Sequence, residues 1–229
     1  MLERSSFINN SSPLSQLSAV VFLGGELQNE ELARELAAKA TLIVCADSGA
    51  EHARKLAIMP HVIIGDLDSV STETINYFKE RNCEIVRNPD QYSNDFEKTL
   101  IYLLEKSQKS VFVFGMTGGR TDHTLANFSV MLRYTDRFAS IIAFELNAEH
   151  KFLTTTKNYC SIDCEIGTTI SLTPFGEANG ITTENLQYPL SDEAMRLGVR
   201  EGLSNLATGS PVSIKISTGS LLVTVIHKS

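Results

Sequence analysis

The sequence predicts an α/β domain with a mainly parallel sheet, followed by a smaller C-terminal β-sandwich. From Ser18 to about Glu145, short β-branched runs alternate with segments of helical periodicity, which is typical of βα units on a parallel sheet. Beyond Glu145, helical periodicity nearly disappears, and hydrophobic and polar residues alternate as in strands with one buried face. We therefore predict a flexible N-terminal extension, an α/β domain and a β-sandwich, over residues 1–17, 18–146 and 147–229.

Six short apolar runs are the predicted strands of the first domain. Most of them end at glycine or at acidic residues, which favour turns at the point where a strand stops. The six runs are Ala19–Leu23, Leu42–Cys45, His61–Ile64, Glu84–Val86, Val111–Phe114 and Ile141–Phe144.

The segments between these runs predict helices, because apolar residues recur there at spacings of three or four. One helix is predicted over residues 71–79. Another is predicted to begin at Asn94, since Asn94 and Glu97 have the spacing of a capping box. The predicted buried stripes are Leu32, Leu36 and Ala40; Phe96, Leu100, Leu103 and Leu104; and Leu125, Phe128 and Leu132.

The C-terminal part predicts several short strands. Ile170 and Leu172 alternate with polar neighbours, and the same pattern runs through residues 212–217. Turn residues at 218–220 predict a hairpin into a last strand over residues 221–226. Short strands separated by turn signals are typical of a β-sandwich.

Composition narrows the class of protein. Hydrophobic residues make up 42% of the chain and charged residues 21%, which indicates a folded globular protein. The net charge of −7 provides no basic field for nucleic acid, and no run approaches the roughly 18 apolar residues of a membrane span. The four cysteines lack zinc-site spacing, and residues 1–17 lack the apolar run of a secretory signal. We therefore expect a cytoplasmic protein with reduced thiols.

Carboxylates follow several of the predicted strands. Because the carboxyl ends of parallel strands meet at one edge of a sheet, these side chains are expected to line a common site. Two carboxylates about 4 Å apart repel by roughly 4 kcal/mol, so such a cluster favours a divalent cation such as Mg²⁺. Any single aspartate there is equally explained as a turn or N-cap residue. The residues are Asp47, Asp66, Asp68, Asp90, Asp95 and Asp122.

A glycine-rich segment, residues 115–122, joins a predicted strand to a predicted helix. Its backbone N–H groups can approach an anion, and Arg120 can add a bidentate clamp. The segment is not a P-loop, and a Gly-Gly turn alone is weak support for a site. His123 follows it, and a single histidine in the first turn of a helix is more often a polar surface or capping residue than an acid, base or ligand.

Taken together, these segments resemble the thiamine pyrophosphokinase family, from Val21 to Ile226. The resemblance rests on motifs in a common order. They are Ala46–Ala50, similar to the first acidic loop; Gly65–Ser69, similar to a G-D-x-D-S metal loop; Asp90–Gln91 with Asn94–Lys98; Thr117–His123; and Gly202–Asn205, similar to a vitamin-contacting segment.

The resemblance implies an enzyme that transfers the pyrophosphoryl group of ATP to thiamine. It also implies a homodimer whose active sites lie between the α/β domain of one subunit and the sandwich of the other. The implied site residues are Asp66, Asp68 and Asp95 for Mg²⁺; Gln91 and Arg120 for the phosphates; Asp47, Asp122 and Thr117–Gly118–Gly119 to complete the nucleotide site; and Ser204 and Asn205 for thiamine.

Arg120 and Asp122 are also implied to take part in catalysis, and the proton acceptor is left open between Asp68 and Asp95. Ser48, Glu51 and Asn94 depart from the residues most common at these positions. Two other functions use similar residues. One is a metal-dependent hydrolase of nucleotides or phosphate esters, and the other is a catalytically silent thiamine-binding protein.

Overall fold

The computed structural model describes residues 6–7, 18–90 and 92–227, and the chain divides into two compact units. Of the described residues, 18–146 make up the first unit, and 147–227 with Ser6 and Phe7 make up the second. The flexible extension predicted over residues 1–17 lies outside the described residues, apart from Ser6 and Phe7. No helix in the described ranges is long and apolar enough to span a membrane.

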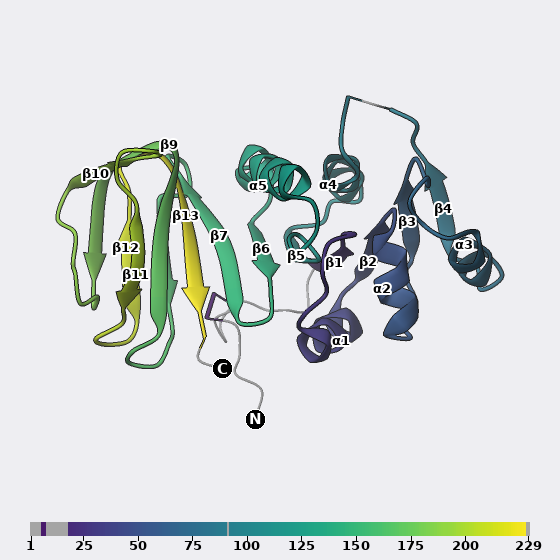
Figure 1. The fold of residues 1–229 in the computed structure, drawn as a ribbon, viewed down its shortest axis with the longest axis horizontal. Coiled ribbons are helices and arrows are strands. Elements are labelled where there is room, and N and C mark those ends of the chain that lie inside the picture. The colour runs from purple at the N-terminus through teal and green to yellow at the C-terminus, as the bar shows by residue number, and fades with distance from the viewer. Residues whose placement is uncertain (1–5, 8–17, 91, 228–229) are drawn as a thin grey trace. The chain divides into compact units, whose positions relative to one another are not determined.

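The first unit contains a parallel sheet of six strands in the order β4-β3-β2-β1-β5-β6 (Figure 1). Every neighbouring pair among them is parallel. The prediction of a mainly parallel α/β sheet is therefore confirmed. The strands are β1 Ser18–Phe22, β2 Leu42–Ala46, β3 Val62–Gly65, β4 Glu84–Arg87, β5 Ser110–Phe114 and β6 Ser140–Phe144.

Five helices connect these strands, and three of them begin at a side chain that caps the first turn. Asn29, Ser71 and Asn94 each accept a hydrogen bond from a backbone N–H three residues later. The N-cap predicted at Asn94 is thus confirmed. The helices are α1 Glu30–Lys39, α2 Gly49–Lys55, α3 Thr72–Lys79, α4 Asp95–Glu105 and α5 Thr121–Thr135.

The buried stripe predicted for α5 is wrong at Leu125, whose residue surface is 61% exposed. The fully buried residues of this helix are Val130, Met131 and Thr135. These three residues lie in the C-terminal half of α5, whereas the residues of its first turns are exposed or half-buried. Those first turns carry His123, Thr124 and Asn127 into a pocket.

The strand order places a switch point between β1 and β5. From β1 the chain runs outward through β2, β3 and β4, and it then returns to the other side of β1 to form β5 and β6. Loops leaving neighbouring strands in opposite directions open a crevice at their carboxyl ends, which is where open α/β sheets bind ligands. Leu23 and Gly25 extend the β1–β5 pairing into this region, because their N–H groups donate to Phe114 and Gly115.

The second unit is a β-rich sandwich, as predicted (Figure 1). Its 16-residue strand β9 pairs antiparallel with β10, β11, β12 and β13, and so takes part in both sheets. Apolar side chains such as Ile170, Leu172 and Ile214 form its core. The strands are β7 Ala148–Thr154, β8 Tyr159–Ile162, β9 Thr169–Glu184, β10 Glu193–Arg196, β11 Gly202–Leu206, β12 Val212–Lys215 and β13 Thr218–Ile226.

The hairpin predicted at residues 218–220 is wrong. These residues belong to β13, which pairs with β7 and β9, whereas β12 pairs with β8 and β9. The chain crosses from one sheet to the other at Ile216, whose side chain is buried, and does not fold back. Gly219 lies at a β-bulge in β13. Glycine is required at this position because its φ is 93° and a Cβ would lie 2.1 Å from the carbonyl oxygen of Glu177.

Candidate active site

A cavity of about 520 Å³ lies at the carboxyl ends of the parallel strands. That volume is in the range of pockets for small organic ligands. All of its lining residues belong to the first unit, and they come from the loops that follow the strands and from the starts of α4 and α5. They are Leu23, Gly24, Gly25, Ala46, Asp47, Ser48, Asp66, Asp68, Ser69, Asp90, Ser93, Asn94, Asp95, Phe96, Lys98, Met116, Thr117, Gly119, Arg120, His123, Thr124 and Asn127.

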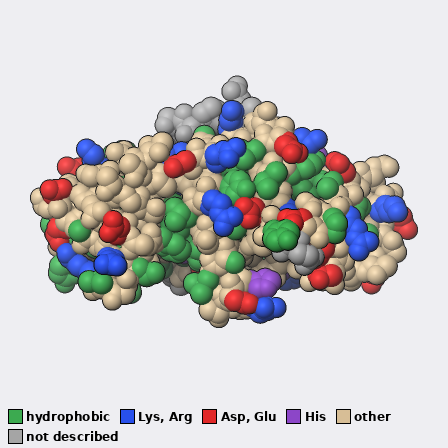
Figure 2. Space-filling model, turned by 90° about the horizontal axis from the view of Figure 1, so that it is seen from above, with side chains coloured by type: hydrophobic (Ala, Val, Ile, Leu, Met, Phe, Trp, Pro, Cys, Tyr) green, Lys and Arg blue, Asp and Glu red, His purple; other side chains and the backbone are tan. Residues whose placement is uncertain are grey.

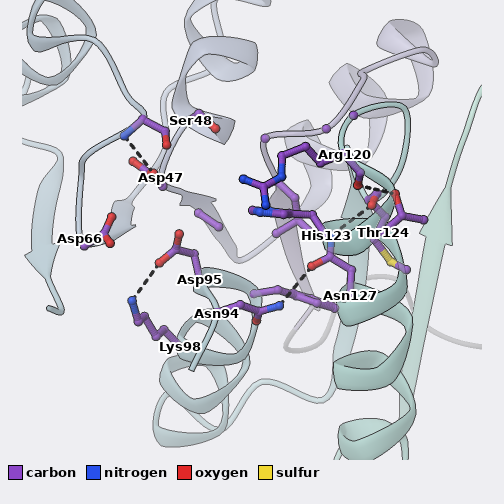
Figure 3. A pocket seen from close by; sticks show the side chains of 18 of the residues that line it. Asp47, Ser48, Asp66, Asn94, Asp95, Lys98, Arg120, His123, Thr124 and Asn127 are labelled. Atoms are coloured by element: carbon purple, nitrogen blue, oxygen red, sulfur yellow. Dashed lines mark hydrogen bonds and ion pairs between the residues drawn. The ribbon is translucent and has the colours of Figure 1, made fainter. Parts of the chain in front are cut away.

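Three aspartates from distant parts of the chain converge in this pocket. One carboxylate oxygen from each of Asp47, Asp66 and Asp95 lies within 4.8 Å of the other two, and Figure 3 shows the three side chains pointing toward one another. Asp47 follows β2, Asp66 follows β3, and Asp95 opens α4. The three carboxylates are called the acidic cluster below.

Backbone geometry allows this close approach. Gly65 immediately precedes Asp66, and a Cβ at position 65 would lie 3.0 Å from the Cβ of Asp47 and 3.3 Å from Oδ1 of Asp95. Asp47 has a φ of 44°, in the left-handed region that aspartate tolerates better than most residues. The cluster therefore depends on a glycine next to one member and on a turn conformation at another.

Burial raises the cost of charge in the acidic cluster. Burial, and then the nearby carboxylate of Asp95, raise the pKa of Asp47 to about 6. Burial also raises the pKa of Asp95, although the ammonium of Lys98 opposes this effect. The Nζ of Lys98 lies 3.1 Å from Oδ1 of Asp95, and the Lys98 side chain is only 3% exposed. Lys98 thus offsets part of the negative charge of the acidic cluster through its ion pair with Asp95.

The acidic cluster fits a hard divalent cation. Among the described residues, Oδ1 of Asp47 is buried and has no hydrogen-bond partner. A buried carboxylate oxygen without a partner is costly, and a cation in front of it removes the cost. Carboxylate oxygens are the ligands that Mg²⁺ prefers, so Asp47, Asp66 and Asp95 are the residues that would hold it.

A pH-dependent effect of Mg²⁺ on stability is expected from Asp47. The pKa of an aspartate in an unfolded chain is about 3.9, so Asp47 holds its proton to higher pH in the metal-free folded protein than in the unfolded chain, up to about pH 6. The contribution of protonated Asp47 to the free energy of unfolding is fully present below about pH 4 and is lost as the pH rises through about 6. The total loss is up to about 3 kcal/mol. Mg²⁺ should therefore raise the melting temperature more at pH 7.5 than at pH 5.

Asp47→Asn is the matched variant for this prediction. Without Mg²⁺ at pH 7.5, it should melt at or above the wild-type temperature, because the buried charge is gone. It should also lose most of the stabilisation by Mg²⁺. Equal stabilisation of both proteins by Mg²⁺ at pH 7.5, measured by differential scanning calorimetry, would contradict the assignment of Asp47 to the cation site.

Asp68 lines the pocket but lies outside the compact group of three. Its carboxylate is exposed and accepts a hydrogen bond from the Ser69 hydroxyl, with an O–O distance of 2.8 Å. Its N–H donates to Oδ1 of Asp66 at 3.3 Å. The structure therefore brings Asp66 and Asp95 together with Asp47, a residue that sequence reasoning gave to the nucleotide, while Asp68 stands at the rim.

Asp90 has a structural role in the turn before α4. Its carboxylate accepts hydrogen bonds from the N–H groups of Tyr92 and Ser93, at 3.1 and 3.2 Å. These hydrogen bonds lower the pKa of Asp90. Gln91, predicted to orient phosphates, lies outside the described residues.

The glycine-rich turn forms another wall of the pocket. Thr117, Gly119 and Arg120 line the cavity, and Thr117 donates its hydroxyl hydrogen to Glu145 at 2.6 Å. Gly118 packs against Glu26 instead, since a Cβ at position 118 would lie 2.3 Å from the Cβ of Glu26. The turn therefore depends on glycine for packing as well as for access.

Arg120 forms an ion pair with Asp122. The guanidinium donates two hydrogen bonds to the Asp122 carboxylate, at 3.1 and 2.5 Å, and both side chains are exposed. These hydrogen bonds lower the pKa of Asp122 to about 2. Asp122 does not line the cavity, so its contact with the pocket is through Arg120.

On the face shown in Figure 2, acidic and basic side chains are interspersed, and no large area carries positive charge alone.

Lys98, His123 and Asn127 are among the lining residues that sequence reasoning did not assign to the site. Lys98 stands one helical turn after Asp95, a spacing that could have predicted the ion pair. His123 was weighed as a surface or capping residue, and it lines the pocket at the start of α5. Asn127, one turn further along α5, carried no sequence signal that set it apart.

Glu51 is turned away from the site. Its carboxylate accepts hydrogen bonds from the N–H of Ser71 and the hydroxyl of Thr74, at 2.9 and 2.6 Å. It thereby joins α2 to the N-terminus of α3. The extra negative charge at this position is used in packing the two helices.

Ser204 and Asn205 lie on β11, in the second unit. Ser204 is exposed and has a φ of 57°. Asn205 is buried, and its amide bonds to the backbone of Tyr188, with Nδ2 donating at 2.7 Å and Oδ1 accepting at 3.0 Å. Asn205 thus holds the segment around Tyr188, whereas Ser204 is exposed and its N–H donates to the Ser171 hydroxyl at 3.0 Å.

The fold and the pocket define a two-unit α/β and β-sandwich protein with a carboxylate-lined ligand site at the switch point of its parallel sheet. Models of the thiamin pyrophosphokinase catalytic domain and of the thiamin pyrophosphokinase vitamin B1 binding domain match residues 33–143 and 149–223. The chain belongs to the thiamine pyrophosphokinase family.

Individual relatives agree with this assignment. Thiamine pyrophosphokinase 2 of Oryza sativa is 28% identical, with 94% of this chain and 88% of the relative covered. Thiamine pyrophosphokinase 1 of Arabidopsis thaliana is 28% identical, with 81% and 78% covered. The crystal structure of thiamine pyrophosphokinase from Bacillus subtilis shares the fold, with a TM-score of 0.81, 21% identity, and 93% of this chain and all of that chain covered.

Proposed function

We propose that this protein is a Mg²⁺-dependent thiamine diphosphokinase, which converts ATP and thiamine into AMP and thiamine diphosphate. The thiamine hydroxyl oxygen forms a bond to the β-phosphorus of ATP. The bond from that phosphorus to the oxygen bridging it to the α-phosphate breaks, and AMP leaves. The hydroxyl proton passes to a carboxylate of the site.

The observation that carries this proposal is the convergence of Asp47, Asp66 and Asp95 within 4.8 Å in a pocket that Arg120 also lines. An acidic pocket repels a triphosphate unless a cation lies between them. Mg²⁺, when bound, supplies charge neutralisation for the phosphates and for the charge that develops on the leaving group.

The side chains of this protein would mainly bind the substrates and orient their reacting groups. Arg120 can exchange its hydrogen bonds with Asp122 for bonds to phosphate oxygens, since both side chains are exposed. Lys98 opposes the rise that burial causes in the pKa of Asp95, and its ion pair holds that carboxylate at the pocket. Gly119 lines the same cavity, so backbone N–H groups of its turn can stabilise an anion there.

Asp68 is the carboxylate we propose as the acceptor of the hydroxyl proton. It lies at the rim of the pocket and has one hydroxyl partner, Ser69. Asp95, the other carboxylate considered for this role, is engaged with Lys98 and belongs to the acidic cluster. An exposed carboxylate beside the cluster is free to approach an entering alcohol.

Product analysis tests the proposed function. The purified protein, incubated with ATP, thiamine and Mg²⁺, should form AMP and thiamine diphosphate in equal amounts, and removal of Mg²⁺ with a chelator should stop both. Release of orthophosphate or pyrophosphate at the same rate without thiamine would indicate a hydrolase. Calorimetric binding of thiamine without AMP formation would indicate a binding protein.

We further propose a homodimer in which Ser204 of one subunit contacts thiamine bound beside the α/β unit of the other. Ser204→Arg, which adds bulk and positive charge against a cationic vitamin, and Asp95→Asn should each be inactive alone. If sites form between subunits, mixed dimers contain one site with both defects and one with neither. Co-refolding equal amounts should restore about a quarter of wild-type activity. Restoration of no activity would contradict the shared site.

A reducing compartment, the cytoplasm, is also proposed. The four cysteines are unpaired, and three of them are buried. Burial raises the pKa of Cys83 to about 11 and that of Cys160 to about 12, which keeps both as unreactive thiols.

A further inference from the structure

Two asparagine side chains lie between the acidic cluster and the glycine-rich turn. Asn94 is the N-cap of α4, directly before Asp95, and Asn127 is on the second turn of α5. Both line the pocket, and Figure 3 shows their amide groups pointing toward each other.

These amides form a continuous chain of hydrogen bonds across the pocket wall. Oδ1 of Asn94 accepts from the N–H of Glu97 at 2.9 Å. Nδ2 of Asn94 donates to Oδ1 of Asn127 at 3.4 Å, and Nδ2 of Asn127 donates to the carbonyl oxygen of Met116 at 3.0 Å. Met116 begins the turn that leads to Arg120.

Chemistry forces the orientation of both amides. The N–H of Glu97 can only donate, so the oxygen of Asn94 must face it, and the carbonyl of Met116 can only accept, so the nitrogen of Asn127 must face it. The remaining atoms, a donor on Asn94 and an acceptor on Asn127, then meet as a complementary pair. Flipping either amide breaks two of the three hydrogen bonds.

The residue type at position 94 is suited to this double role. Serine caps a helix about as well as asparagine does, so capping alone does not require an amide. Only the longer side chain offers a separate donor beyond the capping oxygen. The second contact between α4 and α5 lies outside the cavity, where Glu97 accepts from Arg133 at 2.6 Å and from Tyr134 at 3.1 Å.

We propose that Asn94 and Asn127 are positioning residues, which set the separation between the acidic cluster and the glycine-rich turn and so the fit of the ATP phosphate chain. This inference rests on the proposed function. One end of the hydrogen-bond chain holds the helix that carries Asp95, and the other holds the turn that carries Arg120. A phosphate chain that spans both walls depends on their spacing, and small misplacements of reacting groups cost rate steeply.

A double-mutant cycle tests this inference. Asn94→Ser keeps the cap and removes the bridging donor, and Asn127→Ala removes the acceptor and the bond to Met116. Each should lower kcat/KM for MgATP about tenfold and leave KM for thiamine unchanged, on the scale of coupling between residues in contact. The double variant should have a kcat/KM for MgATP no lower than that of the less active single variant, because either change interrupts the same chain of hydrogen bonds.

Tyr134→Phe is the matched control, since it removes a hydrogen bond between the same two helices outside the pocket. It should leave kcat/KM for MgATP within about twofold. Multiplying effects in the double variant, or an equal loss in Tyr134→Phe, would overturn the inference.

The test remains decisive if the proposed function fails. If the wild-type protein makes no thiamine diphosphate, the reaction assigned above is wrong. Equilibrium binding of Mg²⁺ with a non-hydrolysable ATP analogue to the same five proteins then replaces the kinetic readout. The same non-additive loss should appear in the dissociation constants, and additive losses or none would refute the positioning role.

Discussion

Asp95→Asn is expected to lower kcat by a factor on the order of 10³, because it removes a charge from the acidic cluster where charge stabilisation of the transferred group is concentrated. Asp66→Asn should have a loss of similar size. The fold should persist, since the amide oxygen introduced at position 95 can still accept a hydrogen bond from Lys98. Initial rates of AMP formation at saturating ATP, thiamine and Mg²⁺ measure the effect.

Glu105→Gln is the matched control for Asp95→Asn. It makes the same chemical change at the opposite end of the same helix, where the side chain is exposed. It should retain full activity and near-normal stability. If Asp95→Asn and Asp66→Asn both kept wild-type kcat, the acidic cluster would have no part in the reaction.

Gly115→Ala is expected to cost about 3 kcal/mol of stability and most of the activity. Gly115 has a φ of 71°, and a Cβ there would lie 2.3 Å from the carbonyl oxygen of Leu23. A left-handed conformation costs an L-residue roughly 1–2 kcal/mol, and the backbone contact adds to that cost. The melting temperature of this 229-residue chain should fall by about 10 °C.

Gly119→Ala is the control for Gly115→Ala in the same turn. Apart from its two chain neighbours, no atom of the described residues lies within 4 Å of a Cβ placed at position 119, so the stability of this variant should change by less than about 0.5 kcal/mol. Thermal unfolding followed by circular dichroism compares the two variants. Equal melting temperatures would show that the close approach of the β1 and β5 loops does not support the fold.

Much of the α/β unit could be predicted because its signals are local. Each short apolar run became a strand, and Asn94 became the N-cap of α4. The exposure of Leu125 could not be read from spacing, since periodicity gives a helix its face but does not show where the helix leaves the sheet. The failed hairpin at Gly219 has a similar cause, because turn residues also occur in bulges where a strand enters a second sheet.

The candidate site was predicted as a set of acidic loops, and its inner arrangement was not. Sequence order gives no distance between carboxylates, so only the fold shows that Asp47 joins Asp66 and Asp95 while Asp68 stays exposed. The ion pair of Lys98 and the bridge through Asn127 depend on contacts between elements. Asn205 was predicted from motif order alone, which could not show that its amide is engaged with the backbone of Tyr188.

Anomalous diffraction from crystals grown with Mn²⁺ and a non-hydrolysable ATP analogue would examine the acidic cluster most directly. We expect a manganese peak within about 2.5 Å of carboxylate oxygens from Asp47, Asp66 and Asp95, with analogue phosphate oxygens completing the coordination. A peak bound by other side chains, or crystals with the analogue in the pocket and no metal at these three carboxylates, would contradict the assignment.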